Sequence, residues 1–253
     1  MISARNITLA YGKRVLFDEV NINFIKGNCY GVIGANGAGK STFLKILSGE
    51  IEPNKGTVDI TPGERMSFLK QNQFEFDTCT VLNTVLMGHK KMWEVMHERE
   101  AIYAKADFSE EDGLRAGELE AEFGEMGGYT AESDAATLLS SLGIKDDMHA
   151  SLMQDIPSNM KVRVLLAQAL FGNPDILLLD EVLAVGDLDF RRKCHDKIRY
   201  LSKNGVSIIL VSHHLEPILE FCDRSWQRRR FWFPYRTRTT NHRHRGRYRN
   251  FLS

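Results

Sequence analysis

The sequence predicts an α/β fold with a β-rich amino-terminal part and an α-helical insertion. Short apolar runs at residues 29–33, 176–179 and 207–211 have the composition of strands that are buried in a parallel sheet. Segments with helical spacing of apolar residues lie next to these runs, and this alternation is typical of α/β folds. Residues 78–155 differ from the rest, because they carry charged helical patterns and no strand signal.

Alternation of apolar and polar residues, together with glycines at turns and helix ends, predicts the elements of the amino-terminal part. Apolar and polar residues alternate as in half-buried strands, and Gly49 ends the first helical pattern. In order, we expect strands at 2–9 and 20–25 around a turn at 11–13, a strand at 29–33, a helix at 41–48, a turn at 53–56, and strands through Val58 and at 66–69.

The remaining elements follow from helical periodicity. A strong apolar face runs along residues 160–171, and Gly172 lies just past its end. In order, we expect helices from 81 to about 105 and from 113 to about 123 joined by the acidic segment 107–112, a helix at 160–171, a strand at 176–179, a helix at 190–201, a turn at 204–205 and a strand at 207–211.

Composition fits a folded chain of one large or two small domains. The 253 residues are 43% hydrophobic, with 33 basic and 33 acidic side chains. The longest apolar stretches fall short of the roughly 18 residues of a membrane helix, and no secretory signal develops at the start. We therefore expect a cytoplasmic protein. Its four scattered cysteines match no metal-binding spacing and are expected to be reduced core residues.

A phosphate-binding motif lies between the strand at 29–33 and the following helix. The pattern G-x-x-x-x-G-K-[ST] in this context predicts a P-loop, in which backbone N–H groups and the helix start bind phosphate oxygens. Lys40 is expected to reach the β- and γ-phosphates, and Ser41 to offer its hydroxyl to Mg²⁺. The motif consists of Gly34, Ala35, Asn36, Gly37, Ala38, Gly39, Lys40 and Ser41.

Two further segments carry chemistry at strand ends. The apolar strand at 176–179 runs into Asp180 and Glu181, an arrangement that places one acid beside Mg²⁺ and the next beside an attacking water. His213 follows the strand at 207–211, at the sheet edge where ligands collect in open α/β sheets. We expect His213 to contact the γ-phosphate.

These motifs together resemble the ATP-binding cassette (ABC) ATPases. The loop from Gly34 to Thr42 is similar to that family's loop nearly letter for letter, and the segments ending in Glu181 and His213 follow in the family's order. The resemblance implies an ABC-type nucleotide-binding domain that binds ATP and Mg²⁺. It assigns Tyr11 to adenine stacking, Thr42 to the nucleotide, Gln71 to the Q-loop and the metal, Asp180 to the metal, Glu181 to the catalytic base, Asp187 to the D-loop and His213 to the switch histidine.

Closer similarity divides the chain into two parts. Residues 1–180 resemble the ABC-F branch, which implies a soluble, translation-associated ATPase that binds the ribosome or RNA. Residues 181–224 resemble the ATPase subunits of polysaccharide and teichoic-acid exporters, which implies a membrane permease as partner. The longer match makes the ABC-F role the first expectation. The exporter role and a nucleotide-binding but hydrolysis-impaired fragment are the alternatives.

The resemblance breaks down at the family's signature, Leu-Ser-Gly-Gly. Here the sequence reads Ile156-Pro157-Ser158-Asn159, so the serine and both glycines are out of register. Asn159 or Ser158 is expected to cap the following helix, whereas Pro157 removes an N–H donor. Because the family's signature contacts the γ-phosphate of the opposite protomer, turnover is in doubt. A single cassette also requires a second one in trans to complete its sites.

Charge separates the end of the chain from the rest. Ten arginines and no Asp, Glu or Lys occur from Arg224 onward, which leaves 23 basic against 33 acidic side chains in residues 1–223. Basic residues interleaved with aromatics are one pattern for RNA binding; a disordered end and an out-of-frame translation are the others. We expect a nucleotide-binding domain over 1–224, with its helical part at about 78–155, and a disordered or aberrant tail over 225–253.

Overall fold

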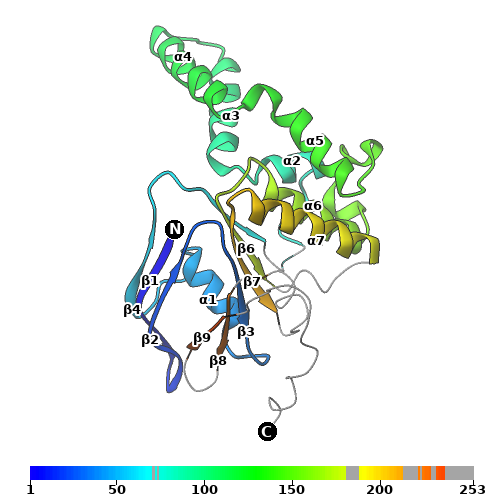
Figure 1. Ribbon diagram of the computed structural model, residues 1–253. Coiled ribbons are helices and arrows are strands. Elements are labelled where there is room, and N and C mark those ends of the chain that lie inside the picture. Colours follow the sequence, from blue (N-terminus) through cyan, green and yellow to red (C-terminus); the bar gives the residue numbers. More distant parts are fainter. Residues whose placement is uncertain are drawn as a thin grey trace.

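The computed structural model describes residues 1–69, 72, 74–180, 188–212, 222, 224–228 and 232–236. Within them lie two sheets and a group of helices that projects from one side of the larger sheet (Figure 1). Among these residues no helix combines the length and apolar character needed to cross a bilayer.

A small antiparallel sheet forms the amino-terminal part. Its strands are β1 (Ile2–Tyr11), β2 (Arg14–Phe24) and β4 (Lys55–Ile60), in the order β2-β1-β4. The two-residue turn between β1 and β2 has Gly12 at φ 59°, a left-handed conformation that favours glycine. This turn pairs Tyr11 with Arg14 across the hairpin.

The larger sheet has six strands, and all neighbouring pairs except the last are parallel. In spatial order the strands are β5 (Met66–Leu69), β6 (Ile176–Asp180), β7 (Ser207–Ser212), β3 (Cys29–Ile33), β8 (Arg224–Arg228) and β9 (Trp232–Arg236). The expected strands at 29–33, 66–69, 176–179 and 207–211 are therefore confirmed to within a residue. Because β5, β6, β7, β3 and β8 run parallel to one another, their carboxyl ends lie at the same edge of the sheet.

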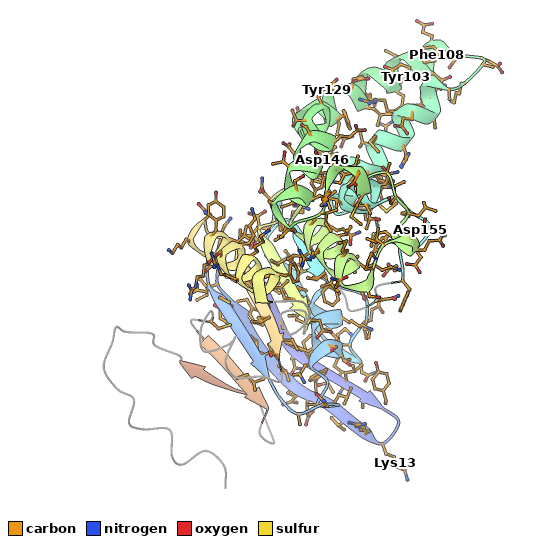
Figure 2. The ribbon with its side chains drawn as sticks, turned by 90° about the vertical axis from the view of Figure 1, so that its right-hand side faces the viewer. Lys13, Tyr103, Phe108, Tyr129, Asp146 and Asp155 are labelled. Carbon is orange, nitrogen blue, oxygen red and sulfur yellow. The ribbon has the colours of Figure 1, made fainter. Side chains whose placement is uncertain are left out.

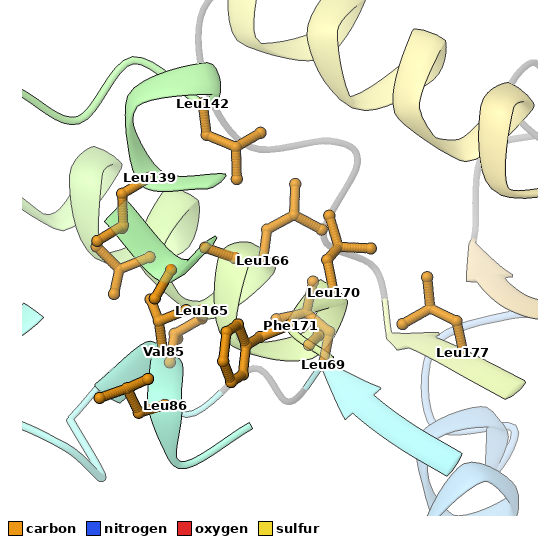
Figure 3. Packing of buried hydrophobic residues seen from close by; sticks show 14 of the residues in the cluster. Leu69, Val85, Leu86, Leu139, Leu142, Leu165, Leu166, Leu170, Phe171 and Leu177 are labelled. Carbon is orange, nitrogen blue, oxygen red and sulfur yellow. The ribbon is translucent and has the colours of Figure 1, made fainter. Parts of the chain in front are cut away.

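Side chains of the central strands point alternately to the two faces of the sheet and pack into two separate apolar cores. On β6, Leu177 and Leu179 enter the first core, while Ile176 and Leu178 enter the second. The first core joins the sheet to the helices, and Figure 3 shows Leu69 of β5 beside Leu170 and Phe171 at the end of α6. The second core lies between the two sheets and includes Phe43 of the first helix. Burial on both faces explains why these strands read as unbroken apolar runs.

Seven α-helices complete the described part of the chain. They are α1 (Lys40–Leu47), α2 (Val81–Leu86), α3 (Lys90–Tyr103), α4 (Glu110–Glu125), α5 (Ala131–Ser141), α6 (Ser158–Leu170) and α7 (Leu188–Lys203). Helices α3 and α4 form a hairpin that projects farthest from the sheets (Figure 1). A capping box between Ser109 and Asp112 starts α4, and the Tyr103 and Phe108 rings stack with centroids 6.2 Å apart at the tip (Figure 2).

The continuous helix expected from residue 81 to about 105 is wrong. The chain breaks between α2 and α3 at residues 87–89, and Gly88 packs directly on the main chain of α6. A Cβ on Gly88 would overlap the carbonyl oxygen of Gln168. This close approach is a long-range constraint, which the local helical pattern does not contain.

The segment 225–253, expected to be a disordered or aberrant tail, contains strand residues in two described segments. Strand β8 pairs parallel to β3, with Tyr30 opposite Arg224, and β9 pairs antiparallel to β8. The ladder bonds of a sheet come from the main chain, so strands can form where the side-chain pattern gives no signal. The rest of the expected tail lies outside the described residues.

The contact at Gly88 yields a stability prediction. Replacing Gly88 with Ala should destabilise the protein by about 1–3 kcal/mol, because a methyl group there must push the α2–α3 junction away from α6. Gly117→Ala is the matched control: an added Cβ at this α4 position has no neighbour within 4 Å, and alanine favours a helix by up to about 1 kcal/mol. Chemical denaturation of both variants measures the difference. Equal unfolding midpoints would contradict the packing described here.

Candidate functional site

The loop between β3 and α1 has the geometry of an anion cradle. Gly37 and Gly39 hold φ angles of 73° and 91°, in the left-handed region that favours glycine. Gly39 is the N-cap of α1, and a Cβ on it would lie 3.0 Å from the Phe17 ring. The backbone thus turns sharply into α1, whose first N–H groups point toward the loop with the positive end of the helix dipole. The expected strand, loop and helix are all present.

Lys40 lies over this loop. Its side chain is 5% exposed, and Nζ donates hydrogen bonds to the carbonyl oxygens of Gly34 (2.9 Å) and Ala35 (3.2 Å). A buried ammonium group needs such acceptors, because desolvation of an isolated charge is costly. The lysine therefore places a positive charge at the centre of the loop.

A cavity of about 470 Å³ opens beside the loop. This volume lies in the range of small-molecule sites. One wall is the loop with the start of α1, and the other is the β1–β2 hairpin. The lining residues are Tyr11, Arg14, Leu16, Asn36, Gly37, Gly39, Lys40, Ser41 and Thr42. The structure thus brings Tyr11, which is 55% exposed, to the same cavity as the phosphate loop.

Arg14 is a residue of this cavity that the sequence analysis missed. Its Nη2 donates a hydrogen bond to the carbonyl oxygen of Gly37 at 2.9 Å. Arg14 faces Tyr11 across the two-residue hairpin turn, so both side chains reach the cavity from adjacent strands. The pairing of Tyr11 with Arg14 around Gly12-Lys13 was the signal in the sequence. Arg14 thus adds a second positive charge beside the phosphate loop.

Asp180 comes to the same sheet edge from β6. Period-two alternation puts it on the face of Ile176 and Leu178, which is the face that α1 covers. Its side chain is 4% exposed. The Asp180 carboxylate and the Ser41 hydroxyl are hard oxygen donors of the kind that Mg²⁺ prefers, and both belong to elements that meet at this edge. The donor set therefore fits Mg²⁺.

The segment in place of the family signature begins α6. Pro157 is the N-cap, and its carbonyl oxygen accepts from the N–H groups of Met160 (2.8 Å) and Lys161 (3.0 Å). The expectation that Asn159 or Ser158 caps this helix is therefore wrong. No side chain makes a cap hydrogen bond at α6, because the residue at the cap position is proline.

Lys161 connects the start of α6 to the segment that follows the expected Q-loop. Its Nζ forms an ion pair with Asp77 at 2.5 Å and lies 5.2 Å from the centre of the Phe74 ring. The lysine is 5% exposed, so this pair is largely shielded from solvent. Sequence patterns contain no signal for it, because the partners are 84 residues apart.

Four predicted functional residues lie outside the described residues. These are Gln71, Glu181, Asp187 and His213. Their roles remain predictions from the sequence. The described strands β5, β6 and β7 end next to three of these positions, at Leu69, Asp180 and Ser212.

A second cavity of about 590 Å³ lies among α3, α5 and α7, away from the phosphate loop. His89 borders it and caps α3, since its Nδ1 accepts from the N–H of Met92 at 3.2 Å. Burial, and then the charge of Arg65, lower the pKa of His89, so the neutral ring that can accept this bond is favoured. His89 is therefore explained by helix capping.

Sequence comparison identifies relatives over most of the chain. Residues 17–184 match the family described as ABC transporter. An uncharacterized ABC transporter ATP-binding protein of Bacillus subtilis, YkpA, is 53% identical over 222 residues, which cover 88% of this chain and 41% of that protein. The probable ATP-binding protein YbiT of Escherichia coli O157:H7 is 47% identical over 213 residues, 84% of this chain and 40% of that protein. The chain thus spans about two fifths of the length of these two relatives.

A third relative is matched over most of its own length. The O-antigen export system ATP-binding protein RfbB of Klebsiella pneumoniae is 32% identical over 226 residues, 87% of this chain and 76% of that protein. Among solved structures, a dimeric ATP-binding cassette in a post-hydrolysis state bound to ADP and Pi aligns with a TM-score of 0.71 at 20% identity. It covers 95% of this chain and 100% of that one. This structural likeness establishes the cassette fold.

Arg14 supports a prediction with a closely matched control. Arg14→Gln should weaken binding of a magnesium nucleoside triphosphate by roughly 3- to 30-fold, because a charge and a hydrogen bond to the loop are lost at an exposed position. Lys13→Gln removes the same charge one residue away, from a side chain that points away from the protein (Figure 2). Titration calorimetry of both variants measures the contrast. An equal loss of affinity in both would mean that only the net charge matters.

Proposed function

The chain belongs to the ABC transporter family of ATP-binding proteins, and on that premise we propose that it binds Mg²⁺·ATP and hydrolyses it together with a second cassette. The observation that carries the proposal is the buried Lys40, whose Nζ lies over a glycine loop that starts a helix. A loop of this shape with a lysine at its centre suits a chain of phosphates, which offers several negative oxygens to one set of N–H donors.

In this proposal each cavity residue has one task. Lys40 exchanges its carbonyl acceptors in the loop for the β- and γ-phosphate oxygens, and neutralises the charge that develops there. Tyr11 stacks on adenine, and Arg14 stabilises the loop through its hydrogen bond to the Gly37 carbonyl oxygen. Ser41 and Asp180 hold Mg²⁺, which when bound neutralises phosphate charge.

Hydrolysis further depends on residues predicted from the sequence alone. Glu181 would orient or deprotonate the attacking water, with Gln71 and His213 beside the γ-phosphate. Since none of the three lies in the described part of the chain, these roles rest on their match to the family's motifs.

Turnover by this chain alone is proposed to be slow. In the family, the signature of one cassette completes the site of the other, and here Pro157 caps the helix where a serine and glycines are expected. A proline at this position supplies no N–H group, and larger residues after it hinder a close backbone approach. A partner cassette with an intact signature would complete the Lys40 site. YkpA and YbiT, which are 53% and 47% identical to this chain, are more than twice as long as the aligned segment, which leaves room for such a partner.

For the biological role, we propose an ATP-binding subunit of an exporter, located in the cytoplasm at a membrane permease. The support is RfbB, whose name describes an export system and which aligns over 76% of its length. The relatives reported above carry names that refer to ATP binding or export. They therefore do not support the first expectation, a translation-associated role, over the transport role.

A translation-associated role on the ribosome is the second candidate. The observation that favours it is the α3–α4 hairpin, which projects from the cassette as a two-helix arm (Figure 1). An ion pair between Arg115 of α4 and Glu98 of α3, at 2.8 Å, joins the two helices of this arm, which extends away from the sheets toward where a large partner could bind. RNA contact through the basic carboxyl-terminal segment would belong to this candidate as well.

Lys40 provides the direct test of nucleotide binding. Lys40→Ala should lower the affinity for Mg²⁺·ATP by at least about 100-fold, because the charge at the centre of the loop is lost. Lys45→Ala, which removes an exposed lysine from the last turn of the same helix, should bind like the wild type. Equilibrium binding of a fluorescent ATP analogue, with circular dichroism as a folding check, measures both. Unchanged affinity in a folded Lys40→Ala protein would refute the assignment.

The two roles differ in what stimulates ATP hydrolysis. If the chain is an exporter subunit, single-turnover hydrolysis should be unaffected by purified ribosomes, and the protein should not co-sediment with them. If it acts in translation, ribosomes should accelerate hydrolysis, and removing the hairpin between residues 90 and 125 should abolish the acceleration. The measurement is hydrolysis of labelled ATP with and without ribosomes. Co-sedimentation with stimulation would reverse the order of the two candidates.

A further inference from the structure

Two cysteines from distant parts of the chain meet in the first apolar core, beside the larger sheet. The Sγ atoms of Cys29 and Cys222 lie 3.2 Å apart, although the residues are separated by 193 positions in the sequence. Cys29 is the first residue of β3, and Cys222 comes two residues before the start of β8. Neither residue belongs to the nucleotide cavity described above.

The surrounding sheet holds Cys29 in place and pairs β3 with the strand that begins two residues after Cys222. Strand β3 is paired on one side with β7, where Cys29 lies opposite Ile208, and on the other with β8, where Tyr30 lies opposite Arg224. The Ile208 N–H also donates to the Asn28 carbonyl oxygen at 3.0 Å. Because β7 pairs with Cys29 and β8 begins two residues after Cys222, sheet pairing brings the two cysteines into the same region of the fold.

Metal binding does not account for the pair within the described part of the chain. Cys29 and Cys222 are 0% and 2% exposed and belong to the first apolar core. Among the residues that the structure describes, no group of three or more His, Cys, Asp or Glu side chains is placed to hold a metal ion. A thiol pair in an apolar core offers one other chemistry, which is oxidation to a disulfide.

We infer that Cys29 and Cys222 are a modification site at which a peroxide forms an intramolecular disulfide. A disulfide has an S–S length of about 2.05 Å, so the sulfurs need to approach by only roughly 1 Å. Hydrogen peroxide is the oxidant class that fits, because it is close to water in size and can reach a buried site through local opening of the sheet.

The reaction balances in two steps. The thiolate of one cysteine attacks the O–O bond of the peroxide, which gives a sulfenic acid and hydroxide. The second thiol then attacks the sulfenic sulfur; the S–S bond forms as the S–O bond breaks, and the oxygen leaves as water. Overall, two thiols lose two electrons and two protons, and one hydrogen peroxide becomes two water molecules.

The crosslink would tie the strand that leads into the phosphate loop to β8. Strand β3 ends at Ile33, directly before Gly34 of the loop. A covalent bond across so long a segment restricts the unfolded chain, so the oxidised protein should unfold at a higher temperature than the reduced one. The site is chemically independent of ATP binding, so failure of the proposed function leaves this inference standing, and the reverse also holds.

Cys194 provides a matched control. It is also buried, on α7, and burial raises the pKa of its thiol to about 12, but its sulfur is not part of the 3.2 Å contact between Cys29 and Cys222. Cys194→Ser should therefore leave formation of the crosslink unchanged. Cys29→Ser and Cys222→Ser should each abolish it.

The experiment treats the full reduced chain with hydrogen peroxide, then denatures it and alkylates the remaining thiols with N-ethylmaleimide. The expected result is two alkylated cysteines instead of four, with one peptide that joins residues 29 and 222 and is released by dithiothreitol. Peptide mapping of the wild type decides the question even if a serine variant fails to fold. Alkylation of all four cysteines after treatment, or a crosslink through Cys79 or Cys194, would overturn the inference.

Discussion

The parallel pairing of β3, β6 and β7 is the constraint on which the rest of the structure depends. It aligns the carboxyl ends of three strands at one edge, and the phosphate loop, Asp180 and the segment after Ser212 all leave from that edge. Burial on both faces fixes the register, because a slip by one residue would exchange the residues of the two cores. The same slip would turn Asp180 away from α1. The strand register that packs the apolar side chains is therefore the same register that directs Asp180 toward α1.

The helical part is attached to this sheet by polar contacts as well as by the first core. Arg65 donates through its guanidinium to the carbonyl oxygens of Gly88 (3.2 Å) and Phe171 (2.7 Å), and its own N–H donates to Asp175 (3.1 Å). Burial lowers the pKa of Arg65, and these acceptors offset the cost of desolvating its charge. Arg65 therefore holds the α2–α3 junction and the end of α6 to the start of β5, while Lys161 and Asp77 hold the other end of α6. Polar contacts thus hold both ends of α6.

The elements near the phosphate loop were predictable because their signals are local. The apolar runs of β3 and β6, the loop motif and Asp180 each occupy a few consecutive residues, so period and spacing suffice to place them. The features that were missed depend on partners far along the chain. The break at Gly88 depends on the main chain of α6, and β8 depends on a strand almost 200 residues earlier. Arg14 is the intermediate case, because its signal was a hairpin register that the turn at Gly12 already contained.

The two cores also separate the surroundings of the phosphate loop from those of α6. Phe17, Phe43 and Leu16 support the hairpin, α1 and the cavity from the second core, whereas α6, which begins after Pro157 and carries Lys161, packs in the first. The strands β6 and β7 contribute alternate residues to both cores and are the physical link between them. An altered first turn of α6 therefore leaves the packing around Lys40 intact. Under the proposed function, the consequence of Pro157 falls on contacts of α6 with a second cassette, so we expect this chain to bind a nucleotide by itself and to need a partner for turnover.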